Sequence, residues 1–253
     1  MAFTLYKNDP SDPPDREVSF KDLDNKGFWC KLGEQKEYAF VQCMEKIDSK
    51  YTVQIHPEKD TNPYHPDLLV NMDGIEYVGE AKIKNSPFFF GNKYGVEPQF
   101  ALTMDLKDSF NYCRLLANGT DLLIFIWVKW EAHEMRHSGG KSYKVKPMRG
   151  IWVTNFSKLR ALETGSTPPG IHWYHAPFRK PPMYKDGVES EWTTQLSKFE
   201  HRLRQEDGSI KNITSDGYIT RNGIDYPAGQ SSGSYVFNLA DEALFERIYY
   251  RQC

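Results

Sequence analysis

Residues 122–128 form an unbroken run of seven apolar side chains, Leu-Leu-Ile-Phe-Ile-Trp-Val. The run is the longest of its kind in the chain, and it is far shorter than the roughly 20 residues that a membrane-spanning helix needs. A strand-length run without a polar side chain is typical of a strand that is buried on both faces of a sheet. We therefore expect a central strand here and no membrane-spanning segment.

The segments before this run alternate between helical and strand patterns. An apolar stripe from Phe40 to Ile47 has helical spacing. Asp73-Gly74 is a hairpin turn signal, and the residues after it alternate in polarity as strand residues do. The predicted order is a helix over 33–48, strands over 51–55, 68–70 and 75–83, a helix over about 100–117 and a strand over 122–128. This order predicts an α/β fold with a mixed sheet.

The remainder of the chain carries weaker patterns. We expect a strand over 150–154, a helix over 155–163 with Asn155 as its cap, and a C-terminal helix over 239–250. The predicted divisions are a loosely structured lead-in over 1–28, a core over 29–165 and a C-terminal extension over 166–253 that packs on the core.

Composition narrows the class of protein. The 253 residues include 39% hydrophobic residues, which is enough for a substantial core. A net charge of −2 argues against a protein that coats nucleic acid by bulk positive charge. Residues 1–17 are polar and rich in Asp and Pro, unlike a signal peptide. The four cysteines are scattered and form no CxxC pair, so we expect a reducing, cytoplasmic location.

The strongest chemical signal lies around the predicted hairpin. Pro66-Asp67 comes just before one strand, and Glu80 and Lys82 lie in the next strand. Because Glu80 and Lys82 are two residues apart, their side chains point to the same face. A hairpin between the strands brings Asp67 alongside Glu80. Two carboxylates and an ammonium group are therefore expected at one edge of a sheet.

Such an arrangement favours a bound cation, because two close carboxylates repel each other. Oxygen ligands at this spacing suit Mg²⁺, with Mn²⁺ expected to substitute, and the carbonyl of Ala81 is a further candidate ligand. A metal here would lower the pKa of a bound water and neutralise charge on a phosphate. Lys82 could orient or help to deprotonate that water, or stabilise developing charge.

This pattern resembles the PD-(D/E)xK nuclease superfamily, which has the restriction-endonuclease-like fold. Pro66 and Asp67 match the PD pair, Glu80 the second acid, Ala81 the variable position and Lys82 the lysine. The predicted element order is similar to the αβββαβ core of that family. The resemblance covers residues 33–128. It implies a magnesium-dependent phosphodiesterase with a mixed central sheet flanked by helices, plus C-terminal additions.

The first helix carries a second resemblance. The segment from Gly33 to Glu37 is similar to the first-helix motif of archaeal Holliday-junction resolvases, a Gly followed by a Glu on the inner face of the helix. Glu37 lies three residues before Phe40, on the apolar face. We take Glu37 as the third acid of the catalytic set and Glu34 as the less favoured choice. His65 and His56, in the loop before Pro66, are weaker candidates.

Positive charge is concentrated between residues 129 and 181, where ten Lys and Arg residues accompany three Glu residues. A local excess of +7 fits contacts with phosphates, although a solvated surface gives the same pattern. Trp173 is a candidate for stacking on unpaired bases. The predicted nucleic-acid-binding residues are Lys84, Lys93, Arg136, Lys141, Trp173, Arg179 and Lys180.

These expectations favour a DNA endonuclease, most specifically a type II-like restriction enzyme that acts as a homodimer and uses residues 166–253 for DNA recognition or dimerisation. A structure-selective or repair nuclease of the resolvase type is a second hypothesis, and RNA remains open as a substrate. Gln99 is followed four residues later by Thr103 rather than Tyr, which disfavours the RecB-like branch. A third hypothesis is a non-cleaving nucleic-acid-binding module on the same fold, and a fourth is an ordinary ion pair between Glu80 and Lys82.

Overall fold

The structure is a computed structural model, and it shows an α/β fold with a mixed central sheet and few helices. None of its helices has the length and apolar character needed to cross a bilayer, within the part of the chain that is described. The described residues are 5–6, 17–18, 36–47, 49–59, 65–130, 133–136, 142–173, 200–204, 209–214, 218–221, 224–227 and 233–252.

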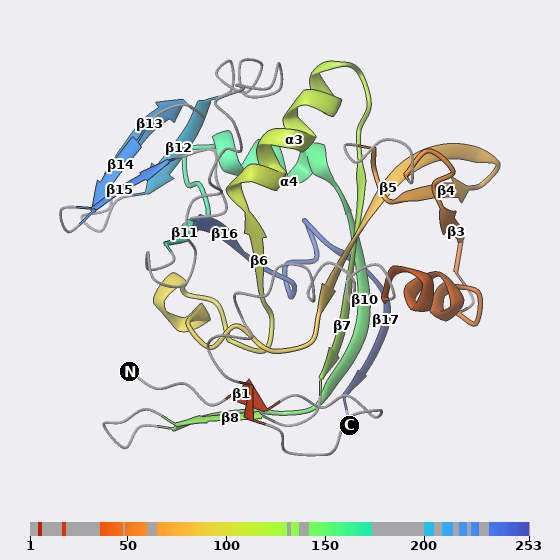
Figure 1. Cartoon of the computed structure of the whole chain (residues 1–253), viewed down its shortest axis with the longest axis horizontal. Helices are drawn as coiled ribbons and strands as arrows, with labels where there is room; N and C mark the ends of the chain where they lie inside the picture. The colour runs from red at the N-terminus through yellow and green to blue at the C-terminus, as the bar shows by residue number, and fades with distance from the viewer. Residues whose placement is uncertain are drawn as a thin grey trace.

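Six strands form the central sheet, in the order β17-β10-β7-β5-β4-β3. β5 and β7 are parallel, and every other neighbouring pair is antiparallel. Figure 1 shows β7, β10 and β17 running together through the molecule, with β3 and β4 on the far side of β5. The strands are β3 (Tyr51–Ile55), β4 (Leu68–Met72), β5 (Ile75–Lys84), β7 (Leu123–Trp130), β10 (Met148–Asn155) and β17 (Glu246–Gln252).

The predicted hairpin is formed by β4 and β5. Asp73 and Gly74 both have positive φ angles, 53° and 82°, as a two-residue type I′ turn requires. The turn fixes the register, which pairs Leu68 with Gly79 at the far end of the ladder. Side chains of β5 alternate as predicted, with Tyr77 and Ala81 on one face and Val78 on the other.

The apolar run at residues 122–128 forms most of β7, and both of its faces are covered. Ile124, Ile126 and Val128 pack into one buried cluster, and Leu123 and Phe125 pack into the other. This double coverage explains why the segment has no alternation of polarity. The prediction of a central buried strand is confirmed.

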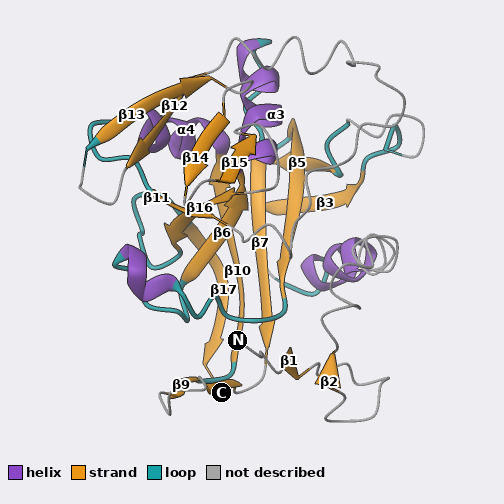
Figure 2. Ribbon diagram, turned by 60° about the vertical axis from the view of Figure 1, so that its left-hand side comes forward, coloured by secondary structure: helices purple, strands orange, loops and turns teal. Residues whose placement is uncertain are grey.

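The central sheet lies between two layers. Helical residues 36–44 cover one face, where Phe40 and Met44 are buried against the sheet. The opposite face carries α3 (Leu106–Ala117), α4 (Phe156–Thr164) and a three-stranded sheet in the order β11-β16-β6. Figure 2 shows the two layers on opposite sides of β7. The small sheet consists of β6 (Ala101–Asp105), β11 (Gly170–Trp173) and β16 (Gly233–Asn238).

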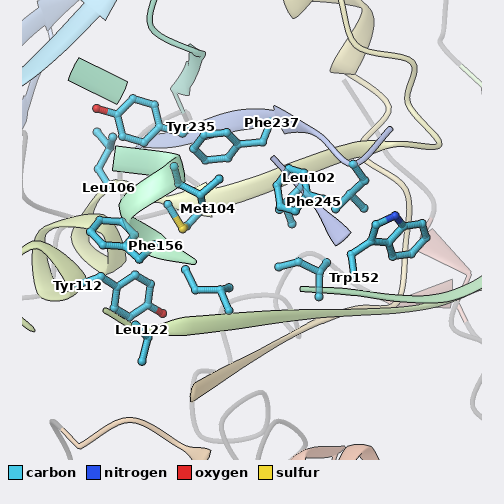
Figure 3. Close-up of a cluster of buried hydrophobic side chains, with 14 of the residues drawn as sticks. Leu102, Met104, Leu106, Tyr112, Leu122, Trp152, Phe156, Tyr235, Phe237 and Phe245 are labelled. Atoms are coloured by element: carbon cyan, nitrogen blue, oxygen red, sulfur yellow. The ribbon is translucent and has the colours of Figure 1, made fainter. Parts of the chain in front are cut away.

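The larger core fills the space between the central sheet and the second layer. Figure 3 shows Tyr112 of α3 beside Phe156 of α4, with Tyr235 and Phe237 of β16 above them. The rings of Tyr112 and Phe156 meet edge to face, with centroids 5.4 Å apart. Aromatic pairs of this kind add to the free energy gained by burial. α3 is thus held firmly over the sheet.

The helix predicted over 100–117 is wrong in its first part, because residues 101–105 form β6. Leu102 and Met104 alternate into the core, and β6 pairs with β16 from a distant part of the chain. The helix begins at Leu106, after Asp105 in extended conformation. Its predicted end is confirmed: Asn118 is the C-cap residue and Gly119 has a φ of 86°.

The helix predicted over 239–250 is also wrong. Residues 239–244 form turns, and residues 246–252 form β17, which pairs with β10. Of the residues predicted to face inward from this helix, Leu239 and Leu244 pack on one buried cluster and Ile248 on the other, so they do not share the single face that a helix would give them. Pairing with β10, together with β-branched and aromatic residues in the segment, favours the strand.

The strand predicted over 150–154 corresponds to β10, and the helix predicted over 155–163 corresponds to α4. Asn155 is the N-cap residue, but its side chain makes no capping hydrogen bond. Asp121 supplies the cap instead: its carboxylate accepts hydrogen bonds from the backbone N–H of Ser157 at 2.9 Å and from the Ser157 hydroxyl at 2.6 Å.

Short elements complete the described part of the chain. A 3₁₀ turn, η1 (Gly91–Tyr94), lies in the loop between β5 and β6. Strands from the C-terminal extension, β16 and β17, pair with β6 and β10 of the predicted core, while the division at residue 165 remains a prediction. The remaining hairpins pair β1 (Leu5–Tyr6) with β2 (Glu17–Val18), β8 (His133–Arg136) with β9 (Ser142–Val145), β12 (Glu200–Arg204) with β13 (Ile210–Thr214), and β14 (Tyr218–Arg221) with β15 (Ile224–Pro227).

Candidate active site

Asp67 and Glu80 lie opposite each other across β4 and β5. The ladder pairs Leu68 with Gly79, so the next position places Asp67 opposite Glu80. Opposed residues of an antiparallel ladder point to the same face, and the side chain of each acid is 17% exposed. The structure thus brings together the two carboxylates that the sequence pattern pairs.

Lys82 lies on the same face of β5, between Glu80 and the helix α3. Its ammonium group donates hydrogen bonds to Glu80 at 3.1 Å and to Asp108 at 2.8 Å. The ammonium nitrogen also lies 5.5 Å from the centre of the Tyr112 ring, on the next turn of α3. Lys82 is therefore held by groups from two elements: Glu80 of its own strand, and Asp108 and Tyr112 on one face of α3.

The charge state of Lys82 follows from these neighbours. Burial alone would lower the pKa of Lys82, but Asp108, Tyr112 and Glu80 outweigh burial and raise it well above its ordinary value. The same attraction outweighs burial at Asp108 and lowers the pKa of its carboxyl group. Lys82 is thus a charged donor, suited to stabilising negative charge rather than to accepting a proton.

Glu37 reaches the same site from the helix on the other face of the sheet. Lys59, in the turn after β3, forms ion pairs with Glu37 and with Asp67, the latter at 2.6 Å. Burial would lower the pKa of Lys59, but its hydrogen bonds to Asp67 and Glu37 raise it. The third acid predicted from the first helix is thus joined to Asp67 through a shared lysine.

The acids of this site repel one another. Burial, and then the negative charge of Glu37, raise the pKa of Asp67 against the effect of Lys59 and Lys82. Burial also raises the pKa of Glu80, and the charges of Asp67 and Asp108 add to it against the effect of Lys82. Ionising both acids is therefore costly, and additional positive charge near them would reduce that cost.

The donor set fits one hydrated divalent cation. Four carboxylates (Glu37, Asp67, Glu80 and Asp108) form ion pairs with two lysines (Lys59 and Lys82), and the charges of Lys107 and Lys84 also act on Asp108. No group of three or more His, Cys, Asp or Glu residues is arranged to hold a metal, among the residues described. Mg²⁺ needs fewer protein ligands than three, because it binds through one or two carboxylates and retains several waters.

Ala81 has its side chain in the cluster on the opposite face, so only its backbone carbonyl remains a predicted ligand. His56 and His65 stack on each other with ring centroids 3.7 Å apart. Burial and the charge of His65 lower the pKa of His56. The backbone N–H of His56 donates to the carbonyl of Asp67 at 2.9 Å, which ties the loop to the start of β4. The histidines thus support the loop. Glu34 lies outside the described residues.

Of the predicted nucleic-acid-binding residues with described side chains, Lys84 lies beside the site: it is two residues after Lys82 on the same face of β5, and its charge helps to lower the pKa of Asp108. Lys84 donates to the carbonyl of Thr103 at 2.7 Å, and Lys93 is exposed beside the Phe90 ring. Trp173 is half-buried at the end of β11 and packs on the large core. Arg136 ends β8, whose backbone alone is described, and Lys141, Arg179 and Lys180 lie outside the described residues.

Three residues of the site were not found by sequence reasoning. Asp108 and Tyr112 lie four residues apart on the predicted second helix, so their shared face was available as a signal. That helix face identifies Asp108 and Tyr112 as residues of the site only when the position of α3 over β5 is known. Lys59 lies in a polar loop, where no periodic pattern marks a position as inward-facing.

A comparison of the chain with protein-family models, with curated proteins and with solved structures finds no match. The geometry of the site is therefore the basis for any statement about function.

Proposed function

We propose that this protein is a magnesium-dependent DNA endonuclease of the PD-(D/E)xK superfamily with a restriction-endonuclease-like fold. The order of elements supports the proposal: a helix, three antiparallel strands β3, β4 and β5, the helix α3, and the strand β7 parallel to β5. β6 is an insertion before α3. A helix covers each face of the sheet, as in the αβββαβ core that the sequence resembles.

The observation that carries the proposal is the placement of Asp67 opposite Glu80, with Lys82 on the same face. An ordinary surface ion pair needs one acid and one base, and it is usually exposed. Here several partly buried acids lie within reach of one another, and burial with this repulsion raises the pKa of Asp67 and Glu80, which is costly for a purely structural cluster. Clustered acids with shifted pKa values are typical of functional sites, and a site that binds a cation and a phosphodiester would account for them.

In the proposed reaction Asp67 and Glu80 would hold Mg²⁺, with Mn²⁺ as a substitute. When bound, the metal would supply a water of lowered pKa and neutralise charge on the phosphate. Lys82 donates a hydrogen bond to the phosphate, where negative charge increases in the transition state. Glu37 and Asp108 keep Lys59 and Lys82 in position through the ion pairs described above.

We expect DNA as the substrate and a type II-like restriction enzyme as the specific activity, acting as a homodimer. The test uses supercoiled plasmid, linear DNA, branched DNA and RNA with Mg²⁺, Mn²⁺ or EDTA. Discrete plasmid fragments support a site-specific enzyme, whereas cleavage of branched DNA alone supports a resolvase-type enzyme.

The decisive variants are Asp67→Ala and Lys82→Ala, which we expect to reduce cleavage by about 100-fold or more. Glu76→Gln is the matched control, because Glu76 is an exposed acid on the same face of β5 as Glu80. Absence of metal-dependent cleavage of every substrate, or full activity of both variants, would show that the proposed function is wrong.

A further inference from the structure

Three exposed cations form a row across the end of the central sheet. The register pairs Lys129 of β7 with Arg149 of β10, and Arg149 with Arg251 of β17. All three side chains are exposed, and the three strands lie side by side in Figures 1 and 2. Because paired residues of antiparallel strands point to the same face, the three side chains emerge together.

The row lies on the face of the sheet that carries helical residues 36–44. On β7, Lys129 is in the same alternation as Leu123 and Phe125, which pack beneath that helix. We call Lys129, Arg149 and Arg251 the basic row.

Strands are about 4.8 Å apart, so the three paired positions extend over roughly 10 Å. Double-stranded DNA carries about one charge per 1.7 Å of helix axis, so several of its phosphates lie within this length. The arginines add planar groups that bind phosphate in a bidentate manner.

We propose that the basic row binds the phosphate backbone of nucleic acid at a second surface, separate from the catalytic site. This inference rests on the proposed function, because it concerns the same substrate. Glu80 is level with Ile124 on β7, and Lys129 lies five residues further, roughly 16 Å along the strand. The row is also on the opposite face from Glu80 and Lys82. It therefore contacts backbone away from the phosphate that is cleaved.

The test measures binding of a fluorescein-labelled 30-base-pair DNA duplex by anisotropy in EDTA, between 50 and 200 mM NaCl. The variant is Lys129→Gln/Arg149→Gln/Arg251→Gln, with Arg149→Gln alone as a second variant in case the triple variant does not fold. Lys50→Gln/Lys158→Gln/Arg247→Gln is the matched control, since it removes the same charge from exposed positions elsewhere.

We expect the triple variant to bind about 10-fold more weakly and to lose about 2 to 3 from the slope of log K against log salt. The control should change neither quantity beyond 2-fold or one slope unit. Where the wild type cleaves, the triple variant should show a raised KM and an unchanged kcat, because the row is distant from the chemistry.

Equal affinity and equal slope for the triple variant and the control would overturn the inference and leave the proposed function intact. Binding only to phosphatidylserine vesicles, and not to the duplex, would also overturn it. If the triple variant binds the duplex more weakly than the wild type, but the wild type cleaves no substrate, the result would support the basic row and contradict the proposed function. A wild type that neither binds nor cleaves contradicts both.

Discussion

The ammonium group of Lys82 has three protons, and two of them are donated to carboxylates from different elements. Glu80 of the same strand takes one and Asp108 of α3 takes the other. The remaining N–H is thus restricted to one direction. In the proposed reaction Asp108 is therefore a positioning residue, because it sets which way Lys82 points.

This role predicts the behaviour of Asp108→Asn. The substitution removes the charge that holds Lys82, and we expect kcat to fall about 10- to 100-fold because a supporting partner is lost. KM should change less than 2-fold. Steady-state kinetics on the substrate that the wild type cleaves provide the measurement, and circular dichroism confirms folding.

A double-mutant cycle separates positioning from a general structural effect. In a Lys82→Ala background, Asp108→Asn should change kcat by less than 2-fold, since the group it positions is gone. Glu163→Gln, which removes another buried acid next to α3, should leave kcat unchanged. Equal losses from Asp108→Asn in both backgrounds would rule out the positioning role.

Among the residues of the site, the sequence predicted the positions that the β4–β5 hairpin alone determines. Asp67 and Glu80 could be paired because Asp73-Gly74 fixes the register between them, and Lys82 follows from strand alternation. Asp108 and Lys59 could not be placed. Their positions depend on how α3 and a loop dock on the sheet, which local patterns do not specify.

Among the elements, α3 and α4 are joined by a buried acid. Glu163 near the end of α4 accepts a hydrogen bond from Ser109 of α3 at 2.7 Å and pairs with Arg160. The side chain is fully buried, and its second carboxylate oxygen has no hydrogen-bond partner among the described residues. Burial raises the pKa of Glu163 to about 7, against Ser109 and Arg160, which lower it.

The stability of the helix pair should therefore depend on pH. The folded state holds a proton on Glu163 more tightly than the unfolded state, whose pKa is near 4.5, so the stabilisation is complete below pH 4.5 and is lost as pH rises through 7. The loss amounts to about 3 kcal/mol. Urea unfolding of the wild type and Glu163→Gln between pH 4.5 and 8 measures it.

Glu163→Gln should lack this dependence and should be at least as stable as the wild type at pH 8. A variant that loses as much stability as the wild type over this range would assign the pH dependence to other groups.

The elements that the sequence predicted correctly are those with local signals: β3, β4 and β5, the end of α3, and the buried strand β7. The errors share one cause. β6 and β17 become strands because they pair with β16 and β10, which are distant in sequence. Apolar spacing in both segments also fits a helix, and strand pairing decided the outcome.

Across the whole molecule, the two edges of the central sheet approach each other. The hydroxyl of Tyr51 on β3 donates to Glu246 on β17 at 3.0 Å, and Lys50 pairs with the same carboxylate. Strands at opposite ends of the sheet order are thus linked over about 195 residues of sequence. Because Tyr51 packs on the face that carries helical residues 36–44, the two edges bend toward that face.

Strand β17 should matter far more to stability than this ion pair. Ending the chain at residue 244 removes buried Phe245 and exposes the edge of β10, and we expect the Tm to fall by about 10 °C or more. Glu246→Gln should cost less than about 1 kcal/mol, because both partners of the pair are roughly half-exposed. Thermal unfolding of both variants provides the comparison. A truncated chain with wild-type Tm would contradict this view of β17.

The late position of β17 has a consequence during synthesis on the ribosome. Roughly 90 residues separate the end of β10 from the start of β17, which takes several seconds at about 5–20 residues per second. Throughout that interval the edge of β10 is unpaired, and unpaired edges recruit strands from other chains. A nascent chain of this protein is therefore most vulnerable to aggregation after its proposed catalytic residues have all been made.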